Sequence, residues 1–209
     1  MIIQATPYGT KKEEPFALTY SGDFTDSRVD GIGDVTLNTS GTLVTTGQTV
    51  KVKVYILAGG GGAACNVSQY WSKDAAASGG GGGNQEVEVT LEPGTYEIVI
   101  GTGGTAANGT GSSELIGGTG GDTIAFGVTS TGGGGGKAKA GTSSSSTRAT
   151  AGLAGSPNAT AGTKKTGESA SGVYNLAGGT PNGGQVTPNS SSSATGYPGG
   201  NGLVRITFS

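Results

Sequence analysis

The chain has 209 residues, of which 45 are glycine, whereas leucine, isoleucine, valine and phenylalanine together number only 36. Such a small apolar share is typical of disordered chains, but disorder also requires a high net charge, and the formal net charge here is only −2. The composition therefore excludes a large conventional apolar core and favours a folded chain that is ordered mostly through main-chain hydrogen bonds.

The charges are divided unevenly along the chain. Residues 1–100 hold 6 basic and 11 acidic side chains, and residues 101–209 hold 6 basic and 3 acidic ones. Neither half has the dense basic stripe that nucleic-acid binding requires. No stretch is long and apolar enough to cross a bilayer. The N-terminal residues lack the succession of charged region, apolar run and small-residue cleavage site that a signal peptide has. We therefore expect no nucleic-acid partner, no membrane insertion and folding in a cytosol.

The polar residues 1–15 are interpreted as an attachment arm, because of their polarity and position. After them, residues 16–20, 34–38 and 41–45 are predicted strands. Residues 22–34 contain four aspartates and three glycines. The spacing of these aspartates does not fit a calcium loop with ligands at every second position, so structural turns are favoured over a calcium site.

Residues 50–56 and 86–91 alternate apolar with polar side chains, which predicts two half-buried strands. If the two strands are neighbours, the lysines of the first face the glutamates of the second. Residues 92–95 read Glu-Pro-Gly-Thr, with proline and glycine at the two central positions that a type II turn prefers. This turn predicts a hairpin that joins residues 85–91 to residues 96–100.

Residues 101–201 are predicted to contain almost no strand, with residues 123–129 as the exception. Residues 202–209 alternate again, and a terminal strand must pair with the earlier ones. We therefore expect one domain over residues 16–209. Its strand framework is residues 16–100 and 202–209, and residues 101–201 are a glycine-rich insertion with loops.

Three runs of four or five consecutive glycines, at residues 59–62, 79–83 and 132–136, lie near predicted strands. Polyglycine II is a threefold helix without internal hydrogen bonds, so its polar groups can bond only to neighbouring segments, and glycine alone allows the close approach. Flexible hinges are the alternative interpretation. The predicted fold is all-β: an antiparallel β-sandwich whose glycine-rich insertion contains stacked polyglycine II helices.

Nothing in the sequence indicates an enzyme or a cofactor. Residues 101–106 satisfy a dinucleotide-binding pattern, but no helix or acidic partner follows, and residues 132–138 fail the phosphate-loop pattern. The chain has no histidine, which removes the commonest general base. Carboxylate pairs suited to glycoside cleavage were not identified. The single cysteine, Cys65, is predicted to be a small buried or half-buried thiol.

The order of these parts resembles the glycine-rich domains of bacteriophage tail proteins and tail-tip adhesins. The resemblance covers residues 16–209 and is carried by LTYSGDF, SGTLVTTGQTVKVKVYILAGGGG, EPGTYEIVIGTGG, GGTGGDTIAF and GGNGLVRITFS. It implies stacked polyglycine II helices, with loops between them that touch the host surface. The glycine runs of such adhesins are longer and more regular, and most runs here after residue 136 are only pairs.

The resemblance places receptor contacts in the loops that interrupt the glycine runs. Residues 65–76 hold the only tryptophan beside a tyrosine, and aromatic faces suit sugar rings or protein loops. The alternative is that these aromatic side chains only cap the sandwich. Lys164 and Lys165 form a further basic pair that needs no function. The expected receptor-binding residues are Tyr70, Trp71, Lys73, Tyr174, Asn175 and Tyr197.

The predicted function is a phage tail-tip or tail-fibre protein that binds a bacterial surface glycan or protein. It would reside in the virion tail after assembly in the host cytoplasm, with other tail proteins as partners, and homo-oligomers remain open. The first alternative is a purely structural baseplate or fibre component. The second is an ice-binding protein built on polyglycine helices, although the regular repeat expected of such a protein is missing.

Overall fold

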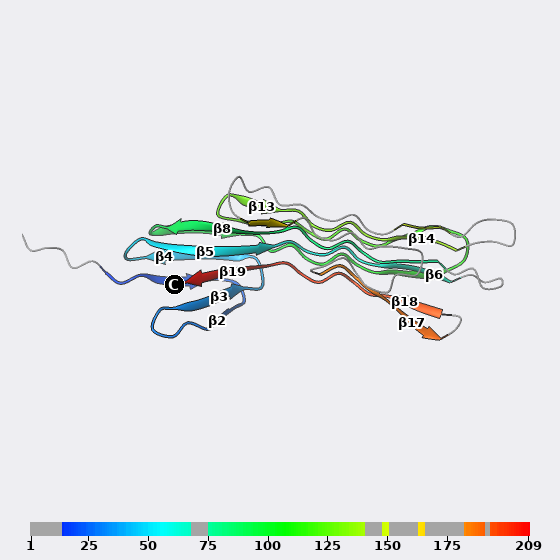
Figure 1. The fold of residues 1–209 in the computed structure, drawn as a ribbon, viewed down its shortest axis with the longest axis horizontal. Helices are drawn as coiled ribbons and strands as arrows, with labels where there is room; N and C mark the ends of the chain where they lie inside the picture. The colour runs from blue at the N-terminus through cyan, green and yellow to red at the C-terminus, as the bar shows by residue number, and fades with distance from the viewer. Residues whose placement is uncertain (1–13, 68–74, 141–147, 151–162, 166–181, 191–192) are drawn as a thin grey trace, which may run out of the picture.

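The computed structural model describes residues 14–67, 75–140, 148–150, 163–165, 182–190 and 193–209, and the structural statements below concern these residues. The molecule is elongated (Figure 1). Two β-sheets form one end, glycine-rich segments run along the middle, and short sheets form the other end, called the distal end here. The described residues form strands and no helix, so the predicted all-β class is confirmed.

The larger sheet has six antiparallel strands in the order β16-β8-β5-β19-β3-β2. Its strands are β2 Phe24–Asp26, β3 Gly33–Leu37, β5 Val50–Leu57, β8 Asn84–Leu91, β16 Thr163–Lys165 and β19 Leu203–Phe208. β19 lies between β5 and β3, so a strand that follows the glycine-rich region pairs with strands that precede it. β5 and β8 are neighbours, as predicted, and Lys53 lies opposite Glu88, but Lys51 lies opposite Thr90 rather than a glutamate.

A smaller antiparallel sheet shares a hydrophobic core with the larger one. Its order is β1-β4-β9, with the bounds β1 Ala17–Tyr20, β4 Gly41–Thr46 and β9 Gly94–Ile98. The core joins Leu43 and Ile98 of this sheet to Val54, Ile56 and Ile206 of the larger sheet, and each of these side chains is at most 1% exposed. Successive side chains of a strand point to opposite faces, so the lysines of β5 reach solvent while its valines enter the core.

The predicted hairpin of residues 85–91 and 96–100 is wrong. β8 pairs with β5 in the larger sheet, whereas β9 pairs with β4 in the smaller sheet. The turn between them therefore carries the chain from one sheet to the other. The Tyr96 hydroxyl fixes this turn by donating to the Glu92 carbonyl at 3.0 Å and accepting from the Glu92 amide at 3.1 Å. A hairpin and a crossover turn both direct alternating apolar residues into one core, so the alternation does not identify the partner strand.

The chain leaves β5 as a glycine-rich segment, residues 58–63, whose six N–H groups point in three directions in turn. The first and fourth residues donate to segment 79–83, the second and fifth to segment 117–121, and the third and sixth to segment 197–202. These hydrogen bonds measure 2.8–3.0 Å between nitrogen and oxygen. A bonding direction that returns at every third residue is the property of a threefold helix.

Six segments surround the central one. Three of them accept its N–H groups, and the other three donate N–H groups to its carbonyls. The six also bond to one another in a closed ring, in the order 79–83, 131–136, 117–121, 101–107, 197–202 and 182–184. The seven segments, called the glycine bundle here, therefore form a hexagonal array in which ring neighbours run in opposite directions along the chain.

Glycine is required in the bundle because its main chains lie very close together. A Cβ atom added to Gly61 would lie 2.0 Å from the carbonyl oxygen of Gly134, and one added to Gly62 would lie 2.0 Å from that of Thr105. Among the described residues, the positive φ angles fall outside the bundle, as the polyproline II geometry with φ of about −75° requires. We therefore interpret its segments as short polyglycine II helices.

Polar side chains complete the hydrogen bonding where the bundle meets the larger sheet. The Asn182 side-chain amide donates to the carbonyls of Ala58, Gly200 and Asn201 at 2.9–3.0 Å, and its oxygen accepts from the Gly82 amide at 3.1 Å. One side chain thus ties three segments of the bundle together. Main-chain groups that would otherwise lack a partner at this end are satisfied in this way.

The glycine-rich region contains more strands than the sequence predicted. Residues 123–129, expected to form one strand, instead form the hairpin of β12 and β13, whose turn holds Phe126 at φ 52° and Gly127 at φ 75°. Such short strands give too few alternations to be recognised from sequence. The remaining strands are β6 Ala64–Val67, β7 Ala75–Ala77, β10 Ala107–Thr110, β11 Leu115–Ile116, β12 Thr123–Ala125, β13 Val128–Ser130, β14 Lys137–Lys139, β15 Arg148–Thr150, β17 Val186–Ser190 and β18 Ser193–Gly196.

Candidate functional site

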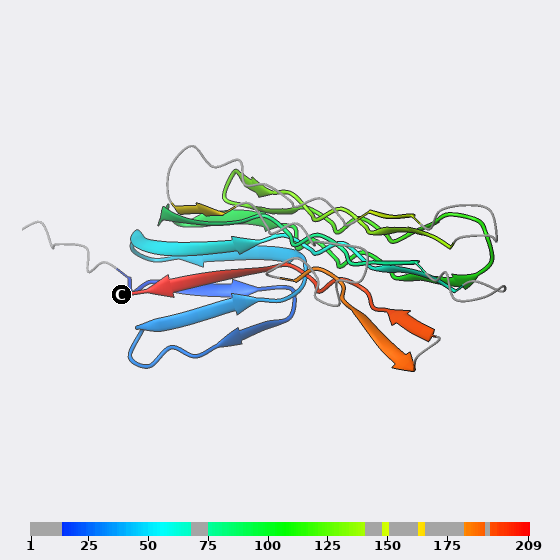
Figure 2. The same cartoon turned by 45° about the vertical axis from the view of Figure 1, so that its right-hand side comes forward.

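The distal end collects four chain connections. Four segments of the bundle run to this end, where they lead into β6 and β7, β10 and β11, β14 and β15, and β17 and β18. Figure 2 shows these strands at the end of the molecule opposite the two large sheets. Chain stretches that are far apart in sequence are thereby presented together on one support.

Two three-stranded sheets of the distal end pack against each other through alanine. Their orders are β10-β6-β7 and β11-β14-β15. A small core of Ala64, Ala75 and Ala138 lies between them, with Ala107 and Leu115 packed at its margin. Because alanine projects only one carbon beyond the main chain, the two sheets keep the close spacing that the bundle imposes on them.

Asparagine side chains tie the distal strands to each other. Asn108 of β10 donates to the carbonyl of Gly196 at 2.9 Å and accepts from its amide at 2.8 Å, as a paired main-chain residue would. The Asn66 side chain, 1% exposed, donates to the carbonyl of Ser113, while its oxygen has no hydrogen-bond partner. These contacts hold β18 and the loop before β11 in place.

Five of the six predicted receptor-binding residues lie outside the described residues. Tyr70, Trp71 and Lys73 belong to the stretch between β6 and β7, and Tyr174 and Asn175 belong to the stretch after β16. The two ends of the first stretch are fixed, because β6 and β7 pair with each other at the distal end.

Tyr197 is the predicted site residue that the structure describes. It directly follows β18, its amide donates to the Gln185 carbonyl at 2.8 Å, and its carbonyl accepts from Ala63 of the central segment at 3.0 Å. The side chain is 42% exposed. Tyr197 is therefore an exposed aromatic side chain on an anchored main chain, as a contact residue requires.

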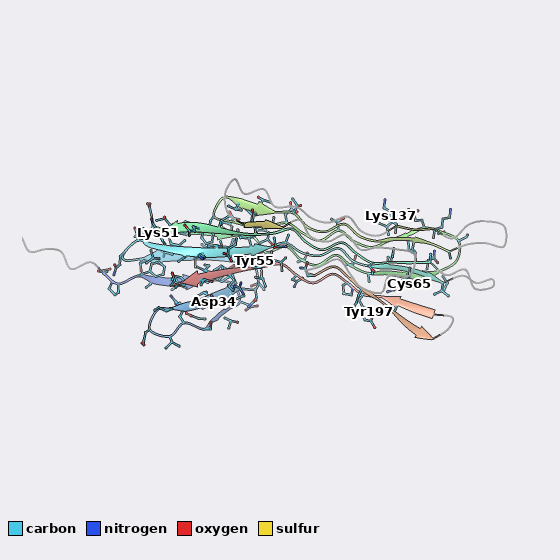
Figure 3. All side chains as sticks on the ribbon, in the orientation of Figure 1. Asp34, Lys51, Tyr55, Cys65, Lys137 and Tyr197 are labelled. Atoms are coloured by element: carbon cyan, nitrogen blue, oxygen red, sulfur yellow. The ribbon has the colours of Figure 1, made fainter. Side chains whose placement is uncertain are left out.

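Sequence reasoning missed the exposed face of the β11-β14-β15 sheet. Lys137 and Lys139 are exposed on β14 while Ala138 between them is buried, and Ile116 of β11 is 54% exposed. Figure 3 shows Lys137 on the side of the distal end away from Tyr197. The available signal was the alternation Lys-Ala-Lys directly after the third glycine run, which was considered only as the end of a phosphate-loop pattern.

The acidic residues of the predicted turn region serve the two large sheets. Asp26 forms an ion pair with Arg28 at 2.6 Å, and the hydrogen bond from that guanidinium is the main cause that lowers the pKa of the Asp26 carboxyl. Asp34 accepts a hydrogen bond from the Thr207 hydroxyl at 2.7 Å. Within the described ranges, no three acidic or cysteine side chains are arranged to hold a metal ion.

Cys65 on β6 is 1% exposed, so the predicted buried thiol is confirmed. The described part of the chain contains no helix long and apolar enough to span a membrane.

The architecture defines a class of protein in which a β-sheet base supports a glycine bundle and presents connections at its far end. The sequence model of the glycine-rich domain family matches residues 36–209. The chain therefore belongs to this glycine-rich domain family, and the match runs from β3 through β19. No curated protein matches the chain.

Proposed function

We propose that the chain is a recognition module that binds a bacterial surface receptor through its distal end, and that it acts at the tip or fibre of a phage tail. One observation carries the proposal: four chain connections are brought to one end of a bundle whose segments are fixed by main-chain hydrogen bonds. Binding residues often lie on loops that a rigid scaffold positions.

The bundle suits this role because it separates support from recognition. Three of the connections, β6–β7, β10–β11 and β17–β18, begin and end on segments held by neighbouring main chains, so changes within them need not alter the bundle. A rigid base also lowers the entropy lost when loops bind a receptor. The proposed aromatic contacts are the exposed side chain of Tyr197 and the stretch that contains Tyr70 and Trp71.

The phage assignment rests on the resemblance of residues 16–209 to tail glycine-rich domains. In this proposal the virion tail is the location, and other tail proteins are the partners at the end formed by the large sheets. An exposed aliphatic pair supports an assembly contact there: Val29 is 74% and Ile32 is 63% exposed on the tip of the turn between β2 and β3.

The test uses the purified chain with a fluorescent label and a panel of bacterial strains, read by flow cytometry. We expect saturable binding to one strain or a few related strains. The variant with Tyr70→Ala and Trp71→Ala should lose about tenfold or more in affinity, because buried aromatic contacts carry much of an interface's energy. Its melting temperature should equal that of the native chain.

The matched control changes Val29→Ser and Ile32→Ser, two exposed side chains at the opposite end. This control should bind cells as the native chain does. Unchanged binding by the aromatic variant would remove residues 70–71 from the site. Absence of binding to every strain would contradict recognition altogether.

The second candidate is a purely structural tail component, which the exposed Val29 and Ile32 pair favours. In that case the chain should bind no cells, and the Val29→Ser, Ile32→Ser variant should fail to enter assembled tails. Thermal hysteresis of the purified chain would instead indicate the ice-binding alternative.

A further inference from the structure

The outer face of the β11-β14-β15 sheet is a cationic surface built by strand alternation. Ala138 points into the alanine core and is fully buried, so Lys137 and Lys139 on either side of it must point outward. Figure 3 shows the Lys137 side chain projecting from the bundle into solvent. Because Ala138 packs in this core, β14 cannot turn about its own axis, and both lysines stay on the outer face.

The neighbouring strand β11 adds an exposed apolar side chain beside the lysines, that of Ile116. The register places Arg148 of β15 opposite Lys139, and Ile116 of β11 opposite Lys137. Glu114, which precedes β11, is the nearby acidic residue in sequence. The ion pairs found among the described residues are Arg28 with Asp26 and Arg205 with Asp34, so neither lysine of β14 is neutralised by one.

A second Lys-X-Lys strand in the same protein provides a comparison. β5 carries Lys51 and Lys53 on its outer face with the same alternation. There, Lys53 lies opposite Glu88 across the ladder, so the sheet itself supplies the opposing charge. On β14 the residue opposite Lys139 is another cation, Arg148.

The spacing of the cations indicates the chemistry of a ligand. Residues two apart on one strand lie roughly 7 Å apart, and neighbouring strands lie about 4.8 Å apart. A ligand that meets both lysines therefore carries negative charges within roughly one sugar unit of each other. The exposed Ile116 adds an apolar contact beside them. Two lysines are too few for a nucleic-acid duplex, and one isoleucine is too little apolar surface for a membrane-docking face.

We propose that the outer face of the β11-β14-β15 sheet binds an anionic polysaccharide of the bacterial surface through Lys137 and Lys139. This inference rests on the proposed function, because it names the class of receptor that the distal end takes. Electrostatic contacts of this kind speed the first encounter with a charged cell surface and weaken as salt rises.

The test compares the full chain on dextran sulfate and on uncharged dextran, which share one sugar backbone and differ in charge. Affinity electrophoresis should show retardation by dextran sulfate alone, decreasing as the salt concentration rises. The variant with Lys137→Gln and Lys139→Gln should bind about tenfold more weakly, as expected for two lost charge contacts. The control variant with Lys51→Gln and Lys53→Gln removes the same net charge from the other end and should bind within about twofold of the native chain.

Several outcomes overturn the inference. Equal losses in the two lysine variants would mean that net charge, rather than this face, attracts the polyanion. Binding to phosphatidylglycerol vesicles without binding to dextran sulfate would identify a membrane surface instead. Both variants should also retain the native melting temperature, so that a loss of binding cannot be assigned to unfolding.

The whole-cell assay separates this inference from the proposed function. If labelled chain binds cells, and dextran sulfate competes while the β14 variant binds poorly, both are supported. If cells are bound but neither dextran sulfate nor the lysine changes matter, recognition stands and the anionic receptor is wrong. If dextran sulfate is bound through β14 but no strain is bound, the cationic face stands and bacterial recognition is wrong.

Discussion

The two halves of this molecule are ordered by different chemical groups: apolar side chains in one half and main-chain amides and carbonyls in the other. Between the two large sheets, leucine, isoleucine and valine side chains fill a core, and the main chains stay apart. In the glycine bundle most residues have no side chain, and main chains bond directly to six neighbours around one central segment. The comparison teaches that a chain poor in apolar residues can still be ordered, provided that its polar main-chain groups find partners.

The largest effect should follow from adding one methyl group at the bundle's centre. In Gly61→Ala the new Cβ would meet the Gly134 carbonyl at 2.0 Å, and main chain cannot rotate away as a side chain can. We expect a loss of more than about 3 kcal/mol in the free energy of unfolding, above the usual cost of overpacking. Urea unfolding followed by circular dichroism measures it.

The matched control is Gly94→Ala, where the nearest atom to the added Cβ is the Glu92 carbonyl at 3.9 Å. Its unfolding free energy should stay within about 1 kcal/mol of the native value. If Gly61→Ala were as stable as this control, the close main-chain packing of the bundle would be wrong.

The next effect concerns the side-chain core. Ile206 is fully buried between β5 and β3, so Ile206→Ala should cost about 2–5 kcal/mol through lost burial and the cavity left behind. The comparison with Gly61→Ala is direct, because one region is weakened by removing atoms and the other by adding them. Amide hydrogen exchange can show whether each change loosens only its own region.

A smaller effect is expected where side chains support the bundle. Asn182→Ala removes four hydrogen bonds to segments of the bundle, and we expect it to cost about 1–3 kcal/mol. Asn201→Ala removes the one bond to the Gly103 amide and should cost less. Equal losses in the two variants would show that Asn182 does not tie the segments together.

The smallest effect is the pH dependence of the Asp26 and Arg28 pair. The guanidinium lowers the pKa of the Asp26 carboxyl in the folded state, so the pair stabilises the fold fully above the unfolded pKa of about 3.9. This stability is lost as the pH falls through the folded pKa. Because the carboxyl is largely exposed, the contribution should be below about 0.5 kcal/mol. Asp26→Asn should therefore differ from the native chain at pH 6 and match it at pH 2.

The sequence predicted the strands of the side-chain core well, because alternation is a local property. The valines of β5 and the apolar residues of β19 lie where the period of two places them. The partner strands were harder to predict. The turn after β8 was expected to close a hairpin, yet it crosses between sheets, because the alternation records only which face is buried.

The glycine runs indicated their role, but not their arrangement. Consecutive glycines suggested main-chain packing, while the hexagonal order depends on pairs, such as Gly60 with Gly200, that are distant in sequence. The cationic face was missed because Lys137 and Lys139 were considered as part of a motif rather than as a strand. Only the buried Ala138 between them reveals which way they point.

The central position of segment 58–63 has a consequence for how the protein is made. This segment leaves the ribosome before any of its six neighbours, and the neighbour at residues 197–202 is the last to appear. The amides of Gly60 and Ala63 can bond only to water until then, and a long stretch of chain must be closed before their bonds form. We therefore expect refolding that takes seconds or longer, and nascent chains that depend on chaperones for most of their synthesis.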